Sequence, residues 1–281
     1  MQTVQRVAEL RTAGARARAA GGRFAFVPTM GFLHEGHLGL IDEAKRRARF
    51  VVVSIFVNPL QFAPAEDLSR YPRDPAGDAV KCAARGVDLL FTPASEEMYP
   101  HERRVDVVPR ALDTRWEGAV RPGHFAGVLT VVAKLLNLVQ PDVAIFGQKD
   151  VQQSTLIRAM AEDLNIATEI HVAPTTREAD GLAMSSRNSY LDADGRRSAT
   201  ALSRALFAMR DAFREGERRA APLLARGRTV LDAERGVAVD YLGVADPLTL
   251  EPVEDVTRSS VAMVAARVGR TRLIDNVVLG Q

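Results

Sequence analysis

The feature that most constrains the fold of this chain is a series of short, continuous apolar segments separated by helical patterns. The apolar segments are residues 24–27, 50–57, 87–91 and 143–146, with a weaker one at 166–172. The helical patterns cover residues 39–49, 78–85, 126–139 and 152–164. Strands that are apolar on both faces are typical of parallel sheets, and helices between them indicate βαβ units. The sequence therefore predicts an α/β domain, with a parallel sheet covered by helices on both faces.

The pattern changes after Pro174. A polar stretch rich in Ser, Arg and Asp is followed by two helical patterns and three alternating strands. The helical patterns are residues 196–215 and 220–235, and the strands are 237–244, 259–266 and 271–278. Gly269, between the last two strands, indicates a hairpin. Helices followed by antiparallel strands are typical of a separate α+β domain, so we expect domains at residues 1–175 and 176–281.

Composition argues against several classes of protein. The 37 basic and 35 acidic residues give a net charge of +2, so no overall field attracts nucleic acid or a membrane. The N-terminus lacks the apolar core of a signal peptide, and the longest uncharged stretch near mid-chain, residues 123–133, is too short to span a bilayer. The single cysteine, Cys82, is interpreted as a small buried residue, which fits a reducing compartment. We therefore expect a cytoplasmic protein without nucleic-acid or membrane partners.

The stretch PTMGFLHEGHLGL at residues 28–40 directly follows the first strand and opens a helix. In doubly wound folds ligands bind at the carboxyl ends of the strands, where a helix N-terminus offers N–H groups to an anion. Gly31 allows a sharp turn, and Gly36 leaves room for a nucleotide. His34 and His37 share one face and can both donate hydrogen bonds to phosphate oxygens. The alternative is two surface histidines near a turn; zinc is disfavoured because no third ligand is nearby.

Two further loops follow predicted strands. Asn58 and Gln61 offer amides that suit a substrate with hydroxyl and carboxylate groups, although taken alone they fit an ordinary polar loop better. Lys149 can reach a phosphate, and Asp150 can accept from a ribose or cap the next helix. Because these loops follow parallel strands, we expect them to converge at one edge of the sheet. The convergence predicts an ATP site.

The polar stretch TTREADGLAMSSRNSYL at residues 175–191 lies at the expected domain junction. Ser185, Ser186 and Arg187 place two hydroxyls and a guanidinium in a row, a combination that fits polyphosphate oxygens. A helix cap followed by a linker is the alternative interpretation. A polar loop at a domain junction is also a typical place for a mobile phosphate clamp.

Taken together, the motifs resemble those of the pantoate–β-alanine ligase family, within the HxGH nucleotidyltransferase superfamily. The matching motifs are PTMGxLHxGH at 28–37, NPxQF at 58–62, YPR at 71–73, RPGHFxGV at 121–128, FGxKDxQQ at 146–153, READGLAMSSRN at 177–188 and RLIDN at 272–276. One departure is Gln148, where the family often has glutamate. The resemblance implies a Rossmann-like, doubly wound N-terminal domain, a smaller α+β C-terminal domain that closes over ATP, a homodimer, and Mg²⁺ with the ATP.

The resemblance also implies roles for individual residues. The catalytic residues would be His34, His37, Lys149 and Arg187, with His37 as the proton donor. The ATP site would comprise Met30, Gly31, Phe32, Leu33, His34, Glu35, Gly36, His37, Gly147, Gln148, Lys149, Asp150, Thr176, Met184, Ser185, Ser186 and Arg187. Gln61 and Gln153 would hold pantoate, and Gln61 would also lie where β-alanine enters. The Mg²⁺ ligands are left open, with Asp78 a candidate only by its proximity to the substrate loop.

The implied reaction joins (R)-pantoate to β-alanine. The pantoate carboxylate would attack the α-phosphorus of ATP, pyrophosphate would leave, and the acyl-adenylate would then react with the β-alanine amine. The closest rival is another HxGH adenylyl- or cytidylyltransferase, which would need extra basic residues for a phosphate substrate. A tRNA synthetase would need an anticodon-binding domain, and residues after Thr175 carry no basic stripe. A non-catalytic nucleotide sensor could lose Lys149 or His37, and both are present.

Overall fold

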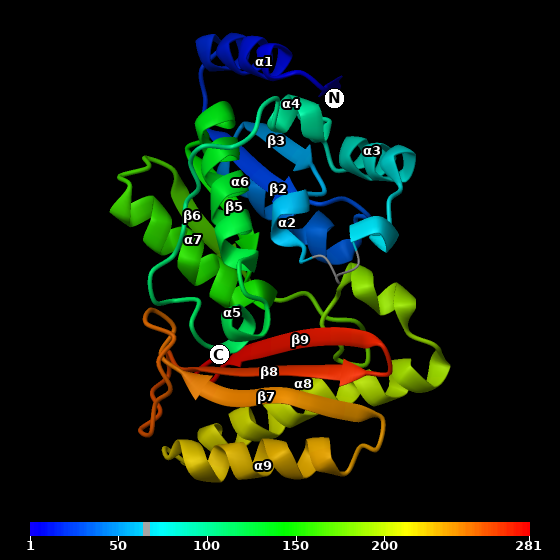
Figure 1. The fold of residues 1–281 in the computed structure, drawn as a ribbon, viewed down its shortest axis with the longest axis vertical. Helices are drawn as coiled ribbons and strands as arrows, with labels where there is room; N and C mark the ends of the chain where they lie inside the picture. Colours follow the sequence, from blue (N-terminus) through cyan, green and yellow to red (C-terminus); the bar gives the residue numbers. More distant parts are fainter. Residues whose placement is uncertain (64–67) are drawn as a thin grey trace. The chain divides into compact units, whose positions relative to one another are not determined.

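The N-terminal part of the chain forms a six-stranded sheet in the order β1-β4-β3-β2-β5-β6, in which every pair of neighbouring strands is parallel (Figure 1). The computed structural model describes residues 1–63 and 68–281. The strands are β1 (Gln2–Val4), β2 (Phe24–Thr29), β3 (Phe50–Ile55), β4 (Leu89–Phe91), β5 (Val143–Gly147) and β6 (Glu169–Ala173). Five of them confirm the predicted strands. β1 was not predicted, because only Val4 of its three residues is buried.

The strand order reverses direction between β2 and β5, which lie side by side. From β2 the chain adds β3 and β4 on one side, and later adds β5 and β6 on the other. Such a reversal is the point where doubly wound sheets bind ligands, outside the carboxyl ends of the strands. PTMGFLHEGH continues from β2 and FGQKD from β5, so both motifs follow the two strands at this point.

Helices cover both faces of the sheet, and each face has its own apolar core. The helices of this part are α1 (Val7–Ala19), α2 (Glu35–Arg47), α3 (Pro75–Ala84), α4 (Ser95–Met98), α5 (Trp116–Val120), α6 (His124–Val139) and α7 (Val151–Asp163). On β2, Phe24 and Phe26 pack with α1, α6 and α7 on one face. Ala25 and Val27 pack with α2 and α3 on the other. Alternate side chains along β2 therefore pack into the two cores on opposite faces of the sheet.

Helices α2 and α3 begin three or four residues earlier than predicted, because capping residues extend them beyond their apolar pattern. α2 begins at Glu35 rather than residue 39, with His34 as its N-cap. α3 begins at Pro75 rather than residue 78, with the Asp74 carboxylate accepting a hydrogen bond from the Gly77 amide at 3.0 Å. Proline in the first turn and aspartate at the N-cap are ordinary signals for a helix start. Both helices therefore start directly from the motif-bearing loops that precede them.

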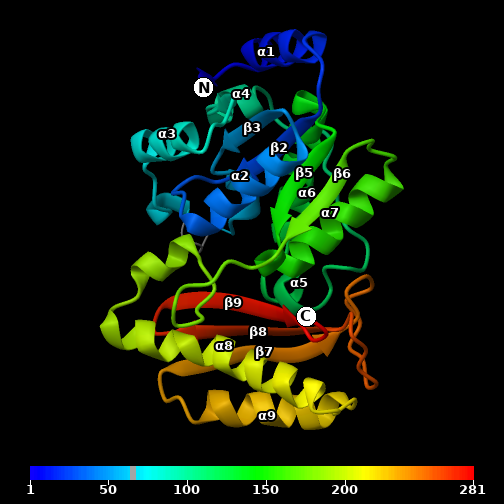
Figure 2. The same cartoon turned by 180° about the vertical axis from the view of Figure 1, so that it is seen from behind.

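The C-terminal part forms a three-stranded antiparallel sheet in the order β7-β8-β9. Its strands are β7 (Val237–Ala245), β8 (Val261–Val268) and β9 (Thr271–Val278), and its helices are α8 (Ala193–Arg214) and α9 (Ala220–Asp232). The predicted hairpin is confirmed, with Val268 paired to Thr271 across Gly269. Both helices pack on the sheet through a shared apolar core, and α8 crosses the sheet in Figure 2.

The contacts within the chain divide it into two units. The N-terminal unit is Met1–Gly147 with Gln152–Ala173, and the C-terminal unit is Gln148–Val151 with Pro174–Gln281. The main division falls two residues before the boundary expected from the sequence. No sequence pattern indicated that residues 148–151 pack with the C-terminal unit. This segment carries Lys149 and Asp150.

The fold bears on the interpretation of Cys82 and on the question of a membrane span. Cys82 is completely buried, and burial raises the pKa of its thiol to about 11, so it remains a neutral core residue. In the part of the chain that the structure describes, no helix combines the length and apolar character needed to cross a bilayer.

Candidate active site

The loop after β2 is held in place by a buried carboxylate. Asp78, on α3, is 1% exposed and accepts hydrogen bonds from the Phe32 and Leu33 amides, each at 2.7 Å. Gly31 has φ +84°, and a Cβ there would lie 2.8 Å from the Ile55 side chain and 3.0 Å from Asp78. Only glycine fits this turn without strain. Since both Asp78 oxygens accept hydrogen bonds from loop amides, Asp78 anchors this loop to α3.

His34 and His37 lie at the N-terminus of α2 with their rings 4.1 Å apart. His34 Nδ1 accepts from the Gly36 amide at 3.2 Å, and His37 Nδ1 accepts from the His34 amide at 3.4 Å. Accepting at Nδ1 places the proton of each neutral ring on Nε2. The pair therefore presents two N–H donors beside the positive end of a helix, an arrangement suited to phosphate oxygens.

The loop after β3 is organised around Asn58, which is 1% exposed. Its Nδ2 donates to the Gly127 carbonyl at 3.1 Å and to Gln61 Oε1 at 3.2 Å. Burial raises the pKa of Tyr99 to about 12, and its neutral hydroxyl donates to Asn58 Oδ1 at 2.9 Å. Gln61 Nε2 in turn approaches Met30 Sδ at 3.0 Å, which brings the loops after β2 and β3 into contact.

The main chain of Gln61 is held by the RPGHF motif at the start of α6. His124 Nδ1 lies 2.8 Å from the Gln61 carbonyl, and Arg121 donates to the same oxygen at 3.2 Å. Arg121 Nη1 also lies 3.0 Å from His124 Nε2. Because arginine only donates, Nε2 must accept and Nδ1 must carry the proton. His124 is therefore neutral in this arrangement, and it positions Gln61 by donating to the Gln61 carbonyl.

The two adjacent glutamines at the start of α7 have different surroundings. Gln152 is 3% exposed and uses its whole amide within the N-terminal unit. It donates to the carbonyls of Leu112 at 2.7 Å and Arg115 at 3.0 Å, and accepts from the Glu117 amide at 2.9 Å. Gln153 is half-buried. Gln152 is thus a structural residue, which leaves Gln153 as the one of the pair suited to a substrate.

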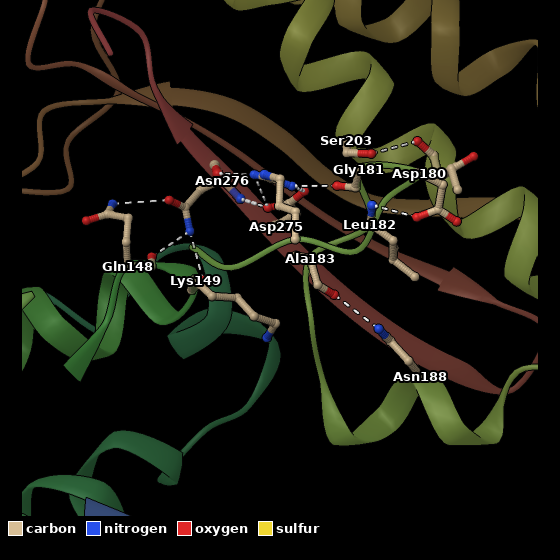
Figure 3. Close-up of polar contacts among 12 residues, drawn as sticks. Gln148, Lys149, Asp180, Gly181, Leu182, Ala183, Asn188, Ser203, Asp275 and Asn276 are labelled. Atoms are coloured by element: carbon tan, nitrogen blue, oxygen red, sulfur yellow. Dashed lines mark hydrogen bonds and ion pairs between the residues drawn. The ribbon is translucent and has the colours of Figure 1, made fainter. Parts of the chain in front are cut away.

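In the C-terminal unit, residues Gln148–Asp150 form a short 3₁₀ turn. Asn276, on β9, donates to the carbonyls of Gln148 at 2.9 Å and Lys149 at 2.8 Å (Figure 3). The Lys149 side chain extends away from Asn276, is 19% exposed, and has its ammonium 3.6 Å from Asp150. The main chain of the turn is therefore held by β9, and the turn carries one cation, the Lys149 ammonium.

The loop that carries the MSSRN motif, in the C-terminal unit, is held together by hydrogen bonds between its own residues. The Thr176 carbonyl accepts from the Met184 amide at 3.0 Å, and Arg177 and Ala183 form an isolated bridge. Ser185 Oγ accepts from the Arg187 amide at 3.2 Å and caps a 3₁₀ helix, Ser186–Tyr190. The capping interpretation is thus correct for Ser185.

Sequence reasoning assigned no role to several residues that organise these loops. They are Arg121, His124, Arg177, Asp275 and Asn276, all within motifs that were recognised. One signal was available for two of them: Asp275 and Asn276 lie between the apolar pairs Leu273–Ile274 and Val277–Val278, and a buried polar residue needs a specific partner. Residues 64–67, inside the second loop, lie outside the described residues.

Within residues 1–63 and 68–281, no three His, Cys, Asp or Glu side chains are grouped so that they could hold a metal ion. A resident metal cage is therefore not a feature of this part of the chain. Mg²⁺ is commonly bound through substrate phosphates with few protein ligands, so a magnesium ion that arrives with ATP needs no such group.

Comparison with known proteins identifies the family. The family model for pantoate–β-alanine ligase matches residues 2–278. The chain belongs to the pantoate–β-alanine ligase family. Pantothenate synthetase 1 of Bradyrhizobium diazoefficiens is 54% identical over 280 residues, covering 99% of this chain and 98% of the relative. The pantothenate synthetase of Pseudomonas entomophila is 53% identical over 282 residues, with the same coverage. Membership of the ligase family, rather than of another HxGH nucleotidyltransferase group, is therefore clear.

Solved structures of the pantoate–β-alanine ligase family have the same fold. Pantothenate synthetase from Thermus thermophilus gives a TM-score of 0.95 at 48% identity, covering 100% of both chains. The ligase from Francisella tularensis, described as complexed with "Beta-gamma ATP and Beta-alanine", gives a TM-score of 0.82 at 31% identity. That match covers 100% of this chain and 98% of the other. The α/β architecture and the ligase class of this chain rest on these agreements.

Proposed function

We propose that this ligase condenses (R)-pantoate with β-alanine in two steps, through a pantoyl-adenylate. The observation that carries the proposal is the placement of the motifs in a member of this family. PTMGFLHEGH follows β2 and NPLQF follows β3, and the two loops touch through Gln61 and Met30. A donor-rich helix start beside a loop of amides suits a nucleotide next to a hydroxy acid.

In the first step, the pantoate carboxylate attacks the α-phosphorus of ATP. The new bond joins the carboxylate oxygen to phosphorus, the bond to the bridging oxygen breaks, and pyrophosphate leaves. Negative charge grows on the phosphate oxygens during this step, so positioned donors lower its barrier. We assign this role to His34, His37, Lys149 and Arg187, with His37 as the proton donor that shares its Nε2 proton with a phosphate oxygen in a hydrogen bond.

The remaining assigned ATP contacts come from the same motifs. In the N-terminal unit they are Met30, Gly31, Phe32, Leu33, Glu35, Gly36 and Gly147. In the C-terminal unit they are Gln148, Asp150, Thr176, Met184, Ser185 and Ser186. Mg²⁺ enters as part of the Mg–ATP substrate. We assign Gln61 and Gln153 to pantoate, because both present half-buried or buried amides beside the loops described above.

In the second step, the β-alanine amine attacks the acyl carbon of the adenylate. The carbon–nitrogen bond forms, the amine loses a proton, and AMP leaves with the electrons of the carbon–oxygen bond. The intact acyl group is transferred without any covalent bond to the protein. Cys82, buried and neutral, is unsuited to act as a nucleophile.

Pyrophosphate release tests the two-step scheme. We expect pantoate and ATP to release pyrophosphate, and to support exchange of labelled pyrophosphate into ATP, without β-alanine. Pantothenate should form only when β-alanine is added. A strict requirement for β-alanine in both measurements would contradict the acyl-adenylate. Failure to form pantothenate under any condition would contradict the substrate assignment itself.

We also propose that the enzyme works as a homodimer in the cytoplasm. The family resemblance and the near-balanced charge, 37 basic against 35 acidic residues, support a small-molecule enzyme without nucleic-acid partners. Light scattering at micromolar concentration should give twice the chain mass of 30.6 kDa. A mass of one chain would contradict the dimer and leave the reaction scheme untouched.

A further inference from the structure

An aspartate and an asparagine are buried side by side in the strand β9. Asp275 is 3% exposed and Asn276 is 2% exposed. Their motif, RLIDN, has no part in the reaction scheme above. Burying a carboxylate and an amide carries a large cost unless both are fully hydrogen-bonded, so such residues need a specific reason to be there.

Every polar atom of the Asn276 side chain has a partner in the turn Gln148–Asp150. Nδ2 donates one hydrogen bond to the Gln148 carbonyl at 2.9 Å and one to the Lys149 carbonyl at 2.8 Å. Oδ1 accepts from Gln148 Nε2 at 3.1 Å (Figure 3). Only one orientation of the amide satisfies these three bonds, because two successive carbonyls can face only the NH₂ group.

Asn276 is itself held by a buried ion pair. Arg177 binds both oxygens of Asp275, at 2.6 and 2.9 Å, and also donates to the Asn276 carbonyl at 3.1 Å and the Gly181 carbonyl at 3.0 Å. Asp275 Oδ1 accepts from the Asn276 amide at 2.7 Å. Burial raises the pKa of Asp275, and the Arg177 guanidinium opposes that rise. The arrangement fixes the backbone of Asn276 on both sides.

We propose that Asn276 is the positioning residue for Lys149. Its two donors fix the orientation of two consecutive peptide groups, and these set the direction in which the Lys149 side chain leaves the turn. Arg177 and Asp275 hold Asn276 for this purpose. The proposal rests on the proposed function, in which Lys149 acts on the ATP phosphates during adenylation. Asn276 touches the backbone of the turn and acts on the reaction only through Lys149.

A double-mutant cycle tests this role. Asn276→Ala should lower the turnover of pyrophosphate release by about 10- to 100-fold, the scale expected when a charged group is misplaced by about 1 Å. In a Lys149→Ala background the same change should lower turnover less than about threefold, because residues that act through one another are not additive. An equal factor in both backgrounds would overturn the proposal.

Two further variants separate positioning from general damage. Asn276→Leu, close in shape and able to pack in the core, should reproduce the loss seen with Asn276→Ala and serves if the alanine variant does not fold. Val277→Ala is the matched control, because Val277 is the next residue on β9, its side chain points to the opposite face of the strand from Asn276, and it packs in the core of the C-terminal unit. It should lower the unfolding temperature while keeping turnover within about threefold of the unmodified enzyme. A loss of turnover in the control equal to that of Asn276→Ala would overturn the proposal.

A measurement independent of activity separates this inference from the proposed function. Hydrogen exchange followed by mass spectrometry reports local opening of a backbone segment. Asn276→Ala should speed exchange in the peptide that covers residues 148–151, and Val277→Ala should leave it unchanged relative to the rest of the C-terminal unit. Unchanged exchange in Asn276→Ala would overturn the positioning role. Faster exchange in an enzyme that releases no pyrophosphate would support the positioning of the turn and overturn only the assigned function.

Discussion

A single methyl group at Gly127 should disturb both the fold and the substrate loop. Gly127 lies on α6, directly against the turn Pro59–Gln61. A Cβ there would lie 2.2 Å from the Leu60 carbonyl oxygen and 2.8 Å from the Gln61 nitrogen. Ordinary contact begins near 3.4 Å, so the turn and the helix must separate by about 1 Å. The obstructing atoms are backbone, and no side-chain rotation relieves the clash.

The magnitude follows from this displacement. Overpacking of this kind costs about 1–3 kcal/mol of unfolding free energy, partly offset by about 1 kcal/mol from replacing a helical glycine. The separation would also stretch the 3.1 Å bond from Asn58 to the Gly127 carbonyl and move Gln61. Because about 1 Å of misplacement can reduce catalysis about 100-fold, we expect Gly127→Ala to lose activity by that order.

Gly14→Ala is the control, since Gly14 is also helical and buried. Its nearest neighbour would be the flexible end of Arg18, at 3.1 Å. This variant should be as stable as the unmodified enzyme or about 0.5–1 kcal/mol more stable, with unchanged kinetics. Urea unfolding and the kcat/KM for pantoate would be measured for both variants. If Gly127→Ala matched Gly14→Ala in both measurements, the inferred contact between α6 and the turn would be wrong.

Three other variants probe the site and its surroundings. Lys149→Ala should lower adenylation by about 100- to 1,000-fold while added pantoyl-adenylate is still converted with β-alanine, and equal losses in both half-reactions would refute a role confined to the phosphates. Asp78→Ala removes the acceptor of two loop amides, one buried and one partly buried, so urea unfolding should show a loss of about 2–6 kcal/mol, and a loss below about 1 kcal/mol would argue against this anchor. The amides of Thr249 and Leu248 lower the pKa of Asp246, which therefore stabilises the fold above its unfolded pKa and ceases to do so as pH falls through the folded value. Asp246→Ala should accordingly lower the unfolding temperature at neutral pH and not in strong acid, and an equal decrease at both would contradict this linkage.

The sheet could be predicted because its strands are apolar on both faces. β2, β3 and β5 each show an unbroken run of buried residues. The apolar run can be read from the sequence of each strand alone, without knowing which strands pair with it. The helix starts were predicted less well. The start of α2 depends on His34 and that of α3 on Asp74, and caps are set by single hydrogen bonds rather than by periodicity.

The placement of the histidine pair could be predicted because it depends on local sequence. His34 and His37 are three residues apart and follow a strand, so spacing and placement suffice. Asn276 could not be assigned in the same way, because its partners lie more than 120 residues away in the sequence. Arg121 and His124 act on Gln61 across some 60 residues. Roles of this kind exist only once the chain is folded.

The packing of residues 148–151 with the C-terminal unit limits how family members can be recombined. The chain leaves the N-terminal unit after Gly147, returns at Gln152 and leaves again after Ala173. A chimera joined at residue 174 would pair the Gln148–Asp150 turn of one parent with the β9 strand of another. Where position 148 is glutamate, a carboxylate would then face Asn276 Oδ1 in place of the amide that donates to it here. Exchange of whole C-terminal units between relatives should therefore succeed only when the short turn is exchanged along with them.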